Sequence, residues 1–401
     1  MLEQYASNLD SWLKKDALPL WWQTGADRER GGFVETINLD GGPTEAARRG
    51  RVQPRQVYCY ALAGRLGWQG PWEQALRHGL TYFEQRFWLE NGYYANAVAA
   101  SGALLDDSFD LYNQAFALFG FAQASLAIPA WRPLLEARSL MLLERLKDDF
   151  GHPIGGFYND LERSVPLRSN PHMHLLEAAM CWESMGGERT LPWSMLADEI
   201  AGLAISRFID SKSGALREFF DADWGPAEGI EGRVVEPGHQ FEWSWLLTRW
   251  GQARQDASAI VLAERLYEIG LRHGVCPNRR VAMMSLLDDF SVHDATARLW
   301  PQTEWLKSSL RLANVSGAIK RDYYLKAADE ACAALTRFLD DAPMPGLWRD
   351  KMAADGTFVS EAAPASSFYH IACAIDELLQ TTNAGAEPSA ALETLMRDRN
   401  A

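Results

Sequence analysis

The chain has 401 residues, of which 47% are hydrophobic and 23% are charged, a composition typical of a folded globular protein and not of a disordered or fibrous one. Its formal net charge of −14 repels phosphate backbones and anionic lipid surfaces, and no basic stretch is longer than the cluster Arg48, Arg49 and Arg51. We therefore expect neither nucleic acid nor membrane partners.

The N-terminal segment MLEQYASNLDSWLKKD has no basic region followed by an apolar core, and nowhere do 18 apolar residues run together. We therefore expect a cytoplasmic protein. The five cysteines are an odd number, are widely spaced and form no CxxC pair, which argues against a disulfide framework or a zinc knuckle. We expect them to be reduced, buried, small apolar residues.

Short segments that combine glycine with aromatic or aliphatic residues recur along the chain, and they look like tight turns or short hairpins. Between them lie pairs of helical segments with apolar residues three and four positions apart, for example 57–68 with 71–88 and 114–127 with 133–150. The glycines that mark the segments, at intervals of 60, 64, 58, 60 and 72 residues, are Gly32, Gly92, Gly156, Gly214, Gly274 and Gly346.

Six helix pairs of this kind predict an all-α protein with an (α/α)6 toroid, or barrel, as its fold. The N-terminal ends of the inner helices and the neighbouring loops would then share one cleft. We place the barrel in a single domain over residues 1–380 and a C-terminal extension over 381–401. A helical bundle without closure is the alternative, and the segment at Gly346 is the weakest match to the repeat.

Two predicted helix starts carry a histidine and a glutamate three residues apart. In NPHMHLLEA these are His174 and Glu177, and in EPGHQFEWSWLL they are His239 and Glu242. Proline and glycine before an apolar run mark the beginning of a helix, so each pair shares one helix face. Taken alone, each pair is also typical of an exposed salt bridge or a capped turn at a helix start.

Two other chemistries fit parts of this pattern. Histidine and carboxylate at this spacing also bind zinc or iron, although metal-binding helices more often carry EExxH or HxxxH. The adjacent acids Asp106-Asp107 and Asp288-Asp289 suggest a glycoside hydrolase with two carboxylates, but such pairs are usually a solvated face or a cap. The sequences GxGxxG, GxxxxGK[ST] and GxSxG do not occur, so dinucleotide, phosphate-loop and serine-hydrolase interpretations lack support.

Five segments in chain order, RVQPRQVY, NPHMHLLEA, EPGHQFEWSWLL, RLWPQTEW and SSFYHI, resemble the N-acylglucosamine 2-epimerase family. That family includes N-acylglucosamine 2-epimerases, cellobiose 2-epimerases and aldose–ketose isomerases that act on mannose or sulfoquinovose. The resemblance covers nearly the whole chain. It implies an (α/α)6 or (α/α)7 barrel, in agreement with the repeat, and it implies no metal and no cofactor.

The resemblance also implies roles for individual residues. His239 and His370 match the two catalytic histidines, which remove and return the proton at C2 of the sugar. The residues that we expect to bind the substrate, around its oxygens or as an aromatic wall, are Arg55, Tyr58, His174, Glu177, Glu242, Trp300 and Glu304. Trp243 and Trp348 are further candidates for stacking on the sugar. Leu299 precedes Trp300 where 2-epimerases of the family carry a second tryptophan, which resembles the isomerase branch more.

Proton transfer next to a carbonyl carbon requires a base with a pKa near the working pH, and imidazole, at about 6.5, has one without tuning. A helix N-terminus disfavours imidazolium and would keep His239 neutral, whereas Glu242 acts in the opposite direction. Arg55 and His174 would stabilise the enediolate oxygens. Two bases on opposite faces give 2-epimerisation, whereas one histidine that carries the proton from C2 to C1 gives isomerisation.

We predict a cofactor-independent sugar isomerase, with D-mannose to D-fructose as the reaction. The alternatives are an N-acylglucosamine 2-epimerase, a phosphosugar isomerase with Arg48, Arg49 and Arg51 as candidate phosphate ligands, a glycoside hydrolase, and a non-catalytic sugar-binding toroid. A small-molecule monosaccharide is the expected partner, and the size of the chain is compatible with a homodimer.

Overall fold

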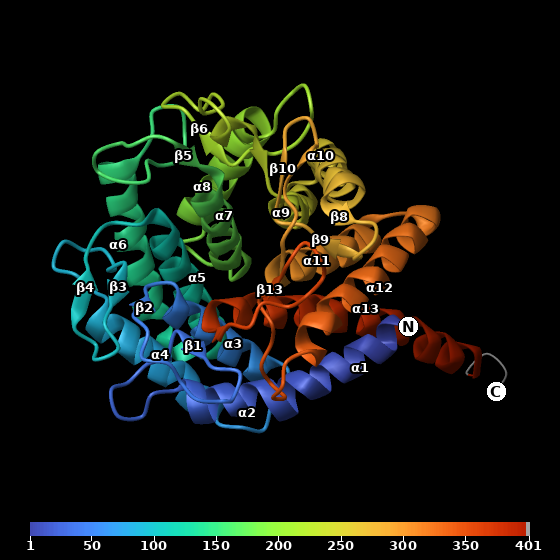
Figure 1. Ribbon diagram of the computed structural model, residues 1–401, viewed down its shortest axis with the longest axis horizontal. Helices are drawn as coiled ribbons and strands as arrows, with labels where there is room; N and C mark the ends of the chain where they lie inside the picture. The colour runs from blue at the N-terminus through green and yellow to red at the C-terminus, as the bar shows by residue number, and fades with distance from the viewer. Residues whose placement is uncertain (398–401) are drawn as a thin grey trace.

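The computed structural model describes residues 1–397 and shows a ring of paired helices (Figure 1). The inner wall of the ring consists of α3 (Val52–Arg65), α5 (Leu111–Ala127), α7 (Ser169–Ser184), α9 (Pro237–Arg254), α11 (Leu299–Val315) and α13 (Ala365–Arg397). The outer layer consists of α1 (Leu2–Trp12), α2 (Leu18–Leu20), α4 (Trp72–Arg86), α6 (Arg132–Phe150), α8 (Leu191–Leu203), α10 (Ala257–Ile269) and α12 (Ala318–Asp340). Short π-helical turns at Leu13–Ala17, Trp21–Gly25, Ala204–Phe208 and Gly270–Gly274 extend outer helices, and 3-10 turns occupy Pro129–Trp131 and Glu231–Arg233.

Burial separates the two layers. Nearly every residue of α5 and of α11 is buried, whichever way its side chain points. In contrast, α4 buries one stripe, formed by Ala75, Leu76, Gly79, Tyr82 and Phe83. A helix that is buried on all sides belongs inside a fold, whereas a helix with one apolar stripe covers it from outside.

The inner helices form a closed ring. They contact one another in the order α3, α5, α7, α9, α11 and α13, and α13 returns to α3. This arrangement confirms the predicted all-α (α/α)6 barrel and excludes an open bundle over residues 1–397. The strands of this part of the chain are two or three residues long, and its sheets contain two or three strands each.

Short antiparallel strands join the repeats at one end of the ring. β14 (Ala363–Pro364) leads directly into α13 and pairs with β1 (Thr36–Ile37), so the last repeat is joined to the first. The other groups are β2 (Arg48–Arg49) with β3 (Ala97–Val98) and β4 (Leu104–Asp106), β5 (Leu167–Arg168) with β6 (Phe219–Phe220), β7 (Val234–Val235) with β10 (Ser285–Leu287) and β11 (Val292–Asp294), β8 (Val275–Cys276) with β9 (Val281–Ala282), and β12 (Ala297–Arg298) with β13 (Lys351–Met352). Because several of these strands run straight into inner helices, they keep the helix N-termini at the same end.

A repeated side-chain contact fixes the hairpin segments against the inner helices. Gln53, in the first turn of α3, accepts a hydrogen bond from the backbone N–H of Phe33 and donates one to its carbonyl, each at 2.8 Å. Such a pair satisfies a buried backbone segment that would otherwise lack partners. The equivalent residues of later helices are Gln114 in α5, His172 in α7, Gln240 in α9 and Gln302 in α11.

The glycines of the repeat are explained by backbone conformation. Gly32, Gly92, Gly156, Gly214 and Gly346 have φ angles between 68° and 87°, a region that favours glycine. Gly346, the weakest match by sequence, therefore conforms to the repeat. The glycine that departs from it is Gly274, which ends a π-helical turn and leads into the β8–β9 hairpin.

α1, at the N-terminal end of the chain, packs against α12 and α13 (Figure 1). α13 runs without a break across residue 380 as far as Arg397. A separate extension over 381–401 stays a prediction, and its residues 398–401 lie outside the described part.

Cys59, Cys181, Cys332 and Cys373 are buried and Cys276 is half-buried, all as free thiols. None of the described helices is long and apolar enough to cross a membrane.

Candidate active site

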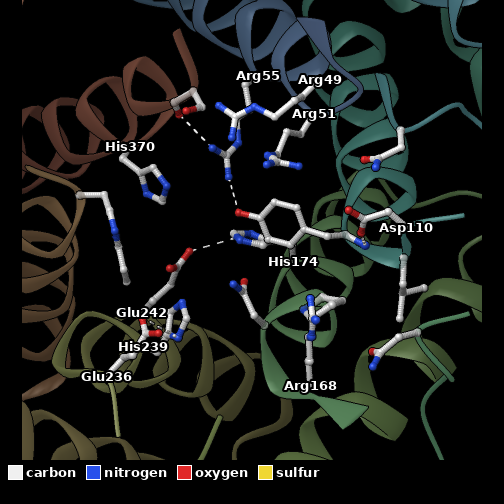
Figure 2. Close-up of a pocket in the computed structure, with 18 of the residues that line it drawn as sticks. Arg49, Arg51, Arg55, Asp110, Arg168, His174, Glu236, His239, Glu242 and His370 are labelled. Atoms are coloured by element: carbon white, nitrogen blue, oxygen red, sulfur yellow. Dashed lines mark hydrogen bonds and ion pairs between the residues drawn. The ribbon is translucent and has the colours of Figure 1, made fainter. Parts of the chain in front are cut away.

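The N-terminal ends of the inner helices and the adjacent hairpins enclose a cavity of about 610 Å³ (Figure 2). This volume lies in the range of sites that bind small molecules. Residues that are far apart in the sequence meet here because each inner helix enters the ring from the same end. The cavity is lined by these members of the predicted set: His239, His370, Arg55, His174, Glu242 and Trp300.

His239 lies in the first turn of α9, which Pro237 and Gly238 begin. Its Nδ1 is 2.8 Å from Glu218 Oε2 and 3.5 Å from Glu236 Oε2. Burial disfavours the charged ring, but the two carboxylates outweigh burial and raise the pKa of His239 to about 10. The ring is therefore protonated at neutral pH. The partial charge of the helix end, which was expected to keep it neutral, is the weaker effect.

His370 lies in the second turn of α13, and its Nδ1 is 2.8 Å from Glu304 Oε1. The other oxygen of Glu304 accepts a hydrogen bond of 2.6 Å from Nζ of Lys307, and both side chains of that pair are fully buried. Burial, followed by the positive charges of Arg55 and Lys307, holds the pKa of His370 well below its usual range. His370 is therefore neutral, and donation from Nδ1 to Glu304 leaves Nε2 free to accept a proton.

Trp300 lies beside both histidines. Its ring centroid is 5.0 Å from that of His239 and 5.8 Å from that of His370. Gly238 makes this approach possible, because a Cβ at that position would come within 2.4 Å of the indole. One protonated and one neutral imidazole thus flank a single aromatic surface on which a sugar ring can stack.

His174, in α7, lies beside two buried carboxylates. Its Nδ1 is 3.3 Å from Glu177 Oε2 and 4.0 Å from Glu242 Oε1, and burial lowers its pKa to about 4. Burial acts to raise the pKa of Glu177, but the hydrogen bond with His174 and the charge of Lys307 lower it overall.

Glu242 differs from its neighbour Glu177 in charge. Burial, with the nearby negative charge of Glu304, raises the pKa of Glu242 well above its usual range. Its Oε1 has no hydrogen-bond partner among the described residues. The cavity wall therefore includes a neutral carboxylic acid, which can donate a proton or a hydrogen bond to a sugar oxygen.

Arg55, at the start of α3, bridges two other inner helices. Its Nη1 donates to the carbonyl of Ser366 at 3.0 Å and its Nη2 donates to the hydroxyl of Tyr112 at 2.6 Å. Figure 2 shows the guanidinium directed into the cavity on the side of His370. A cation held in this way can stabilise negative charge on an enediolate oxygen.

Two predicted substrate-binding carboxylates lie behind the cavity wall. Glu304 supports His370, as described above, and Glu177 lies behind His174 and accepts a hydrogen bond from the hydroxyl of Tyr369. Neither lines the cavity. Their position suits the orientation of a histidine, as in catalytic triads, better than contact with a sugar.

Several apolar residues named from the sequence point into the core. Tyr58, Trp243, Trp348 and Leu299 are buried and do not line the cavity. Leu299 therefore does not contact a bound sugar directly, although its identity favoured the isomerase branch. Of the four aromatic residues expected to stack on the sugar, Trp300 is the one that faces the cavity.

The adjacent acids also lie elsewhere. Asp288 forms ion pairs with Arg217 at 3.1 Å and Arg233 at 2.8 Å, and Asp106 accepts a hydrogen bond from Asn96 at 2.6 Å. None of the four acids in the two pairs lines the cavity, so the glycoside-hydrolase interpretation loses its support.

Three groups of described residues bring potential metal ligands within 4.8 Å of one another: His174 with Glu177 and Glu242, His239 with Glu218 and Glu236, and His370 with Glu242 and Glu304. Most of these atoms already have partners. Nδ1 of each histidine lies beside a carboxylate, and Lys307 supplies the positive charge next to Glu304. A metal ion would have to displace these contacts, and independence from metal stays a prediction.

The sequence interpretation missed Glu218 and Lys307. The repeat does contain a signal for Glu218. The side chain of Gln240 bonds the backbone of Leu216, and Glu218 lies two residues after Leu216. Asn96 and Asn159 occupy the same place in other repeats and line the cavity. Lys307 offers no such signal, since a lysine in a helix usually lies at the surface.

The family profile described as N-acylglucosamine 2-epimerase (GlcNAc 2-epimerase) matches residues 31–374. A relative from Rhizobium meliloti (strain 1021) named mannose-6-phosphate isomerase is 55% identical over 373 residues, which are 93% of this chain and 96% of the relative. A D-mannose isomerase from Thermobifida fusca is 23% identical over 271 residues, 64% of this chain and 65% of the relative.

Solved structures share the fold. A crystal structure of D-mannose isomerase superimposes with a TM-score of 0.82 at 20% identity and covers 95% of this chain and 97% of its own. The structure of cellobiose 2-epimerase from Bacillus thermoamylovorans B4167 has the same TM-score at 16% identity and covers 94% of this chain and 100% of its own.

Proposed function

Because the chain belongs to the N-acylglucosamine 2-epimerase family, we propose that its cavity is the active site of an aldose–ketose isomerase for a mannose-configured sugar. Membership confirms the predicted enzyme class, a sugar isomerase or epimerase. The observation that carries the proposal is that a protonated His239 and a neutral His370 both lie beside Trp300.

In the first half of the reaction, neutral His370 takes the proton from C2 of the open-chain aldose through Nε2. The C–H electron pair forms the C1–C2 double bond, and the carbonyl electrons move to O1, which receives a proton from protonated His239. Arg55 stabilises negative charge on the oxygens while it develops.

In the second half, His370 returns its proton to C1 and not to C2. The O2–H proton passes back to His239 as the C2 carbonyl forms, so both histidines recover their starting charges. Ring opening precedes these steps and requires a proton donor to the ring oxygen. Glu242, a neutral acid in the lining of the cavity, is the group that suits this role.

The mannose configuration is supported by two relatives whose names are mannose-6-phosphate isomerase and D-mannose isomerase. A second outcome uses the same residues: if His239 delivered its proton to C2 from the opposite face, in place of O1, the aldehyde would form again and the product would be the 2-epimer. Family members named cellobiose 2-epimerase make this the alternative to test.

Proton NMR in D2O separates the two reactions. The purified protein, without added metal or cofactor, is incubated separately with D-mannose, mannose 6-phosphate and N-acetylmannosamine. We expect a 2-ketose from a mannose-configured sugar, with hydrogen or deuterium at C1. A 2-epimer that carries deuterium at C2 would contradict the isomerase assignment, and turnover that a chelator abolishes would contradict independence from metal.

We also propose that the protein acts in the cytoplasm on a small-molecule sugar, and that it forms a homodimer. The acidic composition, which disfavours anionic membrane surfaces, supports the first point, and chain size supports the second. Light scattering after gel filtration tests the dimer, since a monomeric mass at assay concentration would contradict it.

A further inference from the structure

The cavity gathers positive charge in a protein whose net charge is −14. Its lining includes the arginines Arg49, Arg51, Arg55, Arg168 and Arg298. Three of these have firm partners. Arg49 pairs with Glu35, Arg298 pairs with Asp350 at 2.7 Å, and Arg55 bonds a backbone carbonyl and a tyrosine hydroxyl.

The remaining two, Arg51 and Arg168, have no acidic partner within ion-pair distance among the described residues. The one side-chain hydrogen bond of Arg51 is a long one, 3.4 Å, to Oδ1 of Asn113. The guanidinium of Arg168 donates to none of the described groups, and the side chain is exposed to the cavity mouth. Burial, followed by the nearby charge of Arg49, lowers the pKa of Arg51, so this cation is held in an unfavourable place.

Both arginines stand at the beginning of an inner helix. Arg51 directly precedes α3 and Arg168 directly precedes α7, where the helix dipole and unpaired N–H groups favour an anion. Figure 2 shows Arg51 and Arg168 on the side of the cavity away from His370, Glu242 and His239. A substrate whose C1 and C2 lie at the histidines would therefore extend its other end toward these two arginines.

Two acids, Asp110 and Asp160, also line the cavity, but each is engaged by the backbone. Asp110 accepts from the N–H of Tyr112 at 2.8 Å, and Asp160 accepts from the N–H of Ser164 at 2.8 Å. Neither forms an ion pair with Arg51 or Arg168 in the described residues. The two guanidinium groups thus remain available for a ligand that carries two negative charges.

We propose that Arg51 and Arg168 form a binding site for a phosphate monoester at the end of the sugar opposite C1. This inference rests on the proposed function, since it places the reacting carbons at the histidines. Guanidinium groups bind phosphate oxygens through paired, charge-assisted hydrogen bonds, and two of them match a dianion. Arg48, the third arginine named from the sequence, has no part in the site because it pairs with Asp27.

The test compares kcat/KM for mannose 6-phosphate with kcat/KM for D-mannose, and uses inorganic phosphate as a competitive inhibitor. We expect the unmodified protein to prefer the phosphorylated sugar. In Arg51→Gln and in Arg168→Gln the ratio of the two kcat/KM values should fall about 30-fold to 100-fold, because each loses a charge-assisted contact to the phosphate. Inhibition by inorganic phosphate should weaken in parallel.

Arg272→Gln is the matched control, since Arg272 is 71% exposed on an outer helix and pairs with Glu268. It removes the same charge and should leave the ratio unchanged. Because Arg168 is exposed, its variant should fold even if the Arg51 variant does not. An unchanged ratio in Arg168→Gln, or no preference for the phosphorylated sugar in the unmodified protein, would overturn the proposal.

Calorimetric titration with inorganic phosphate separates this inference from the proposed function. Binding of phosphate that Arg168→Gln weakens, without turnover of either sugar, would support the phosphate site and refute the isomerase. Turnover of D-mannose with no binding of phosphate would support the isomerase and refute the phosphate site.

Discussion

His239 and His370 have nearly the same surroundings at first sight, but His239 is protonated and His370 is neutral. Each lies near the start of an inner helix, each places Nδ1 2.8 Å from a buried carboxylate, and each flanks Trp300. The two sites differ in the groups that surround the carboxylate beside each histidine. Glu304, beside His370, is already matched by Lys307, whereas the carboxylate beside His239 is reinforced by a second one. Burial and the charges of Arg55 and Lys307 therefore keep His370 neutral, whereas the two carboxylates keep His239 protonated.

The largest expected effect separates the base from the acid. His370→Asn should lower kcat about 10³-fold to 10⁴-fold and should abolish exchange of the C2 hydrogen with D2O, because no base remains. His239→Asn should lower turnover to a similar degree but keep measurable exchange at C2, since His370 still removes that proton. NMR of substrate recovered from D2O measures both quantities. Equal exchange in the two variants would contradict the assigned roles.

Lys307→Met should make the surroundings of His370 similar to those of His239. Without the lysine, Glu304 is a buried carboxylate whose nearest available counter-charge is His370, so the pKa of His370 should rise and activity at neutral pH should fall. The free energy of unfolding should also decrease by about 3–5 kcal/mol, as when one partner of a buried ion pair is removed. The pH profile of kcat/KM and urea unfolding test the two effects.

Lys320→Met is the control for that variant. Lys320 is 61% exposed and pairs with Glu264 on the outer layer, so its loss should change neither the profile nor the stability by a comparable amount. A Lys307→Met protein with an unshifted profile would show that Lys307 does not govern His370.

Glu218→Gln should act on the other histidine and in the opposite direction. In the unmodified protein, activity should fall near pH 10, where His239 loses its proton. Removal of the carboxylate lowers the pKa of His239, so this fall should move to lower pH, and kcat/KM at pH 8 should be about 10-fold lower than in the unmodified protein. A pH profile of kcat/KM measures the shift. Glu73→Gln, at an exposed position on α4, is the control and should leave the profile unchanged.

The smallest expected effect is on the pH dependence of the free energy of unfolding. The pKa of His239 is raised, so its contribution is complete below about pH 6.5 and is lost as pH rises to about 10. The pKa of His174 is lowered, so its contribution is present above about pH 6.5 and is lost as pH falls to about 4. Urea unfolding of His174→Phe should show a weaker loss between pH 6.5 and pH 4 than the unmodified protein. An identical loss would contradict burial of a neutral His174.

Much of the architecture followed from the sequence. The glycine period predicted the helix pairs because a residue with positive φ is needed at the same turn in five of the six repeats, as at Gly32 and Gly214. Proline and glycine before His239 predicted that it begins a helix. Together these features place the inner helix N-termini, and so His174, His239 and His370, at a common end of the ring.

The tertiary structure alone decided which side chains meet there and with what charge. The rotation of each helix about its axis turned Trp300 to the cavity and Leu299 to the core, and residues adjacent in sequence point in different directions on a helix. Long-range pairing then set the charges. Glu218 contacts His239 from a neighbouring hairpin, and Lys307 forms a fully buried ion pair with Glu304. The pKa of a buried group depends on the groups that surround it in space and not on its neighbours in sequence.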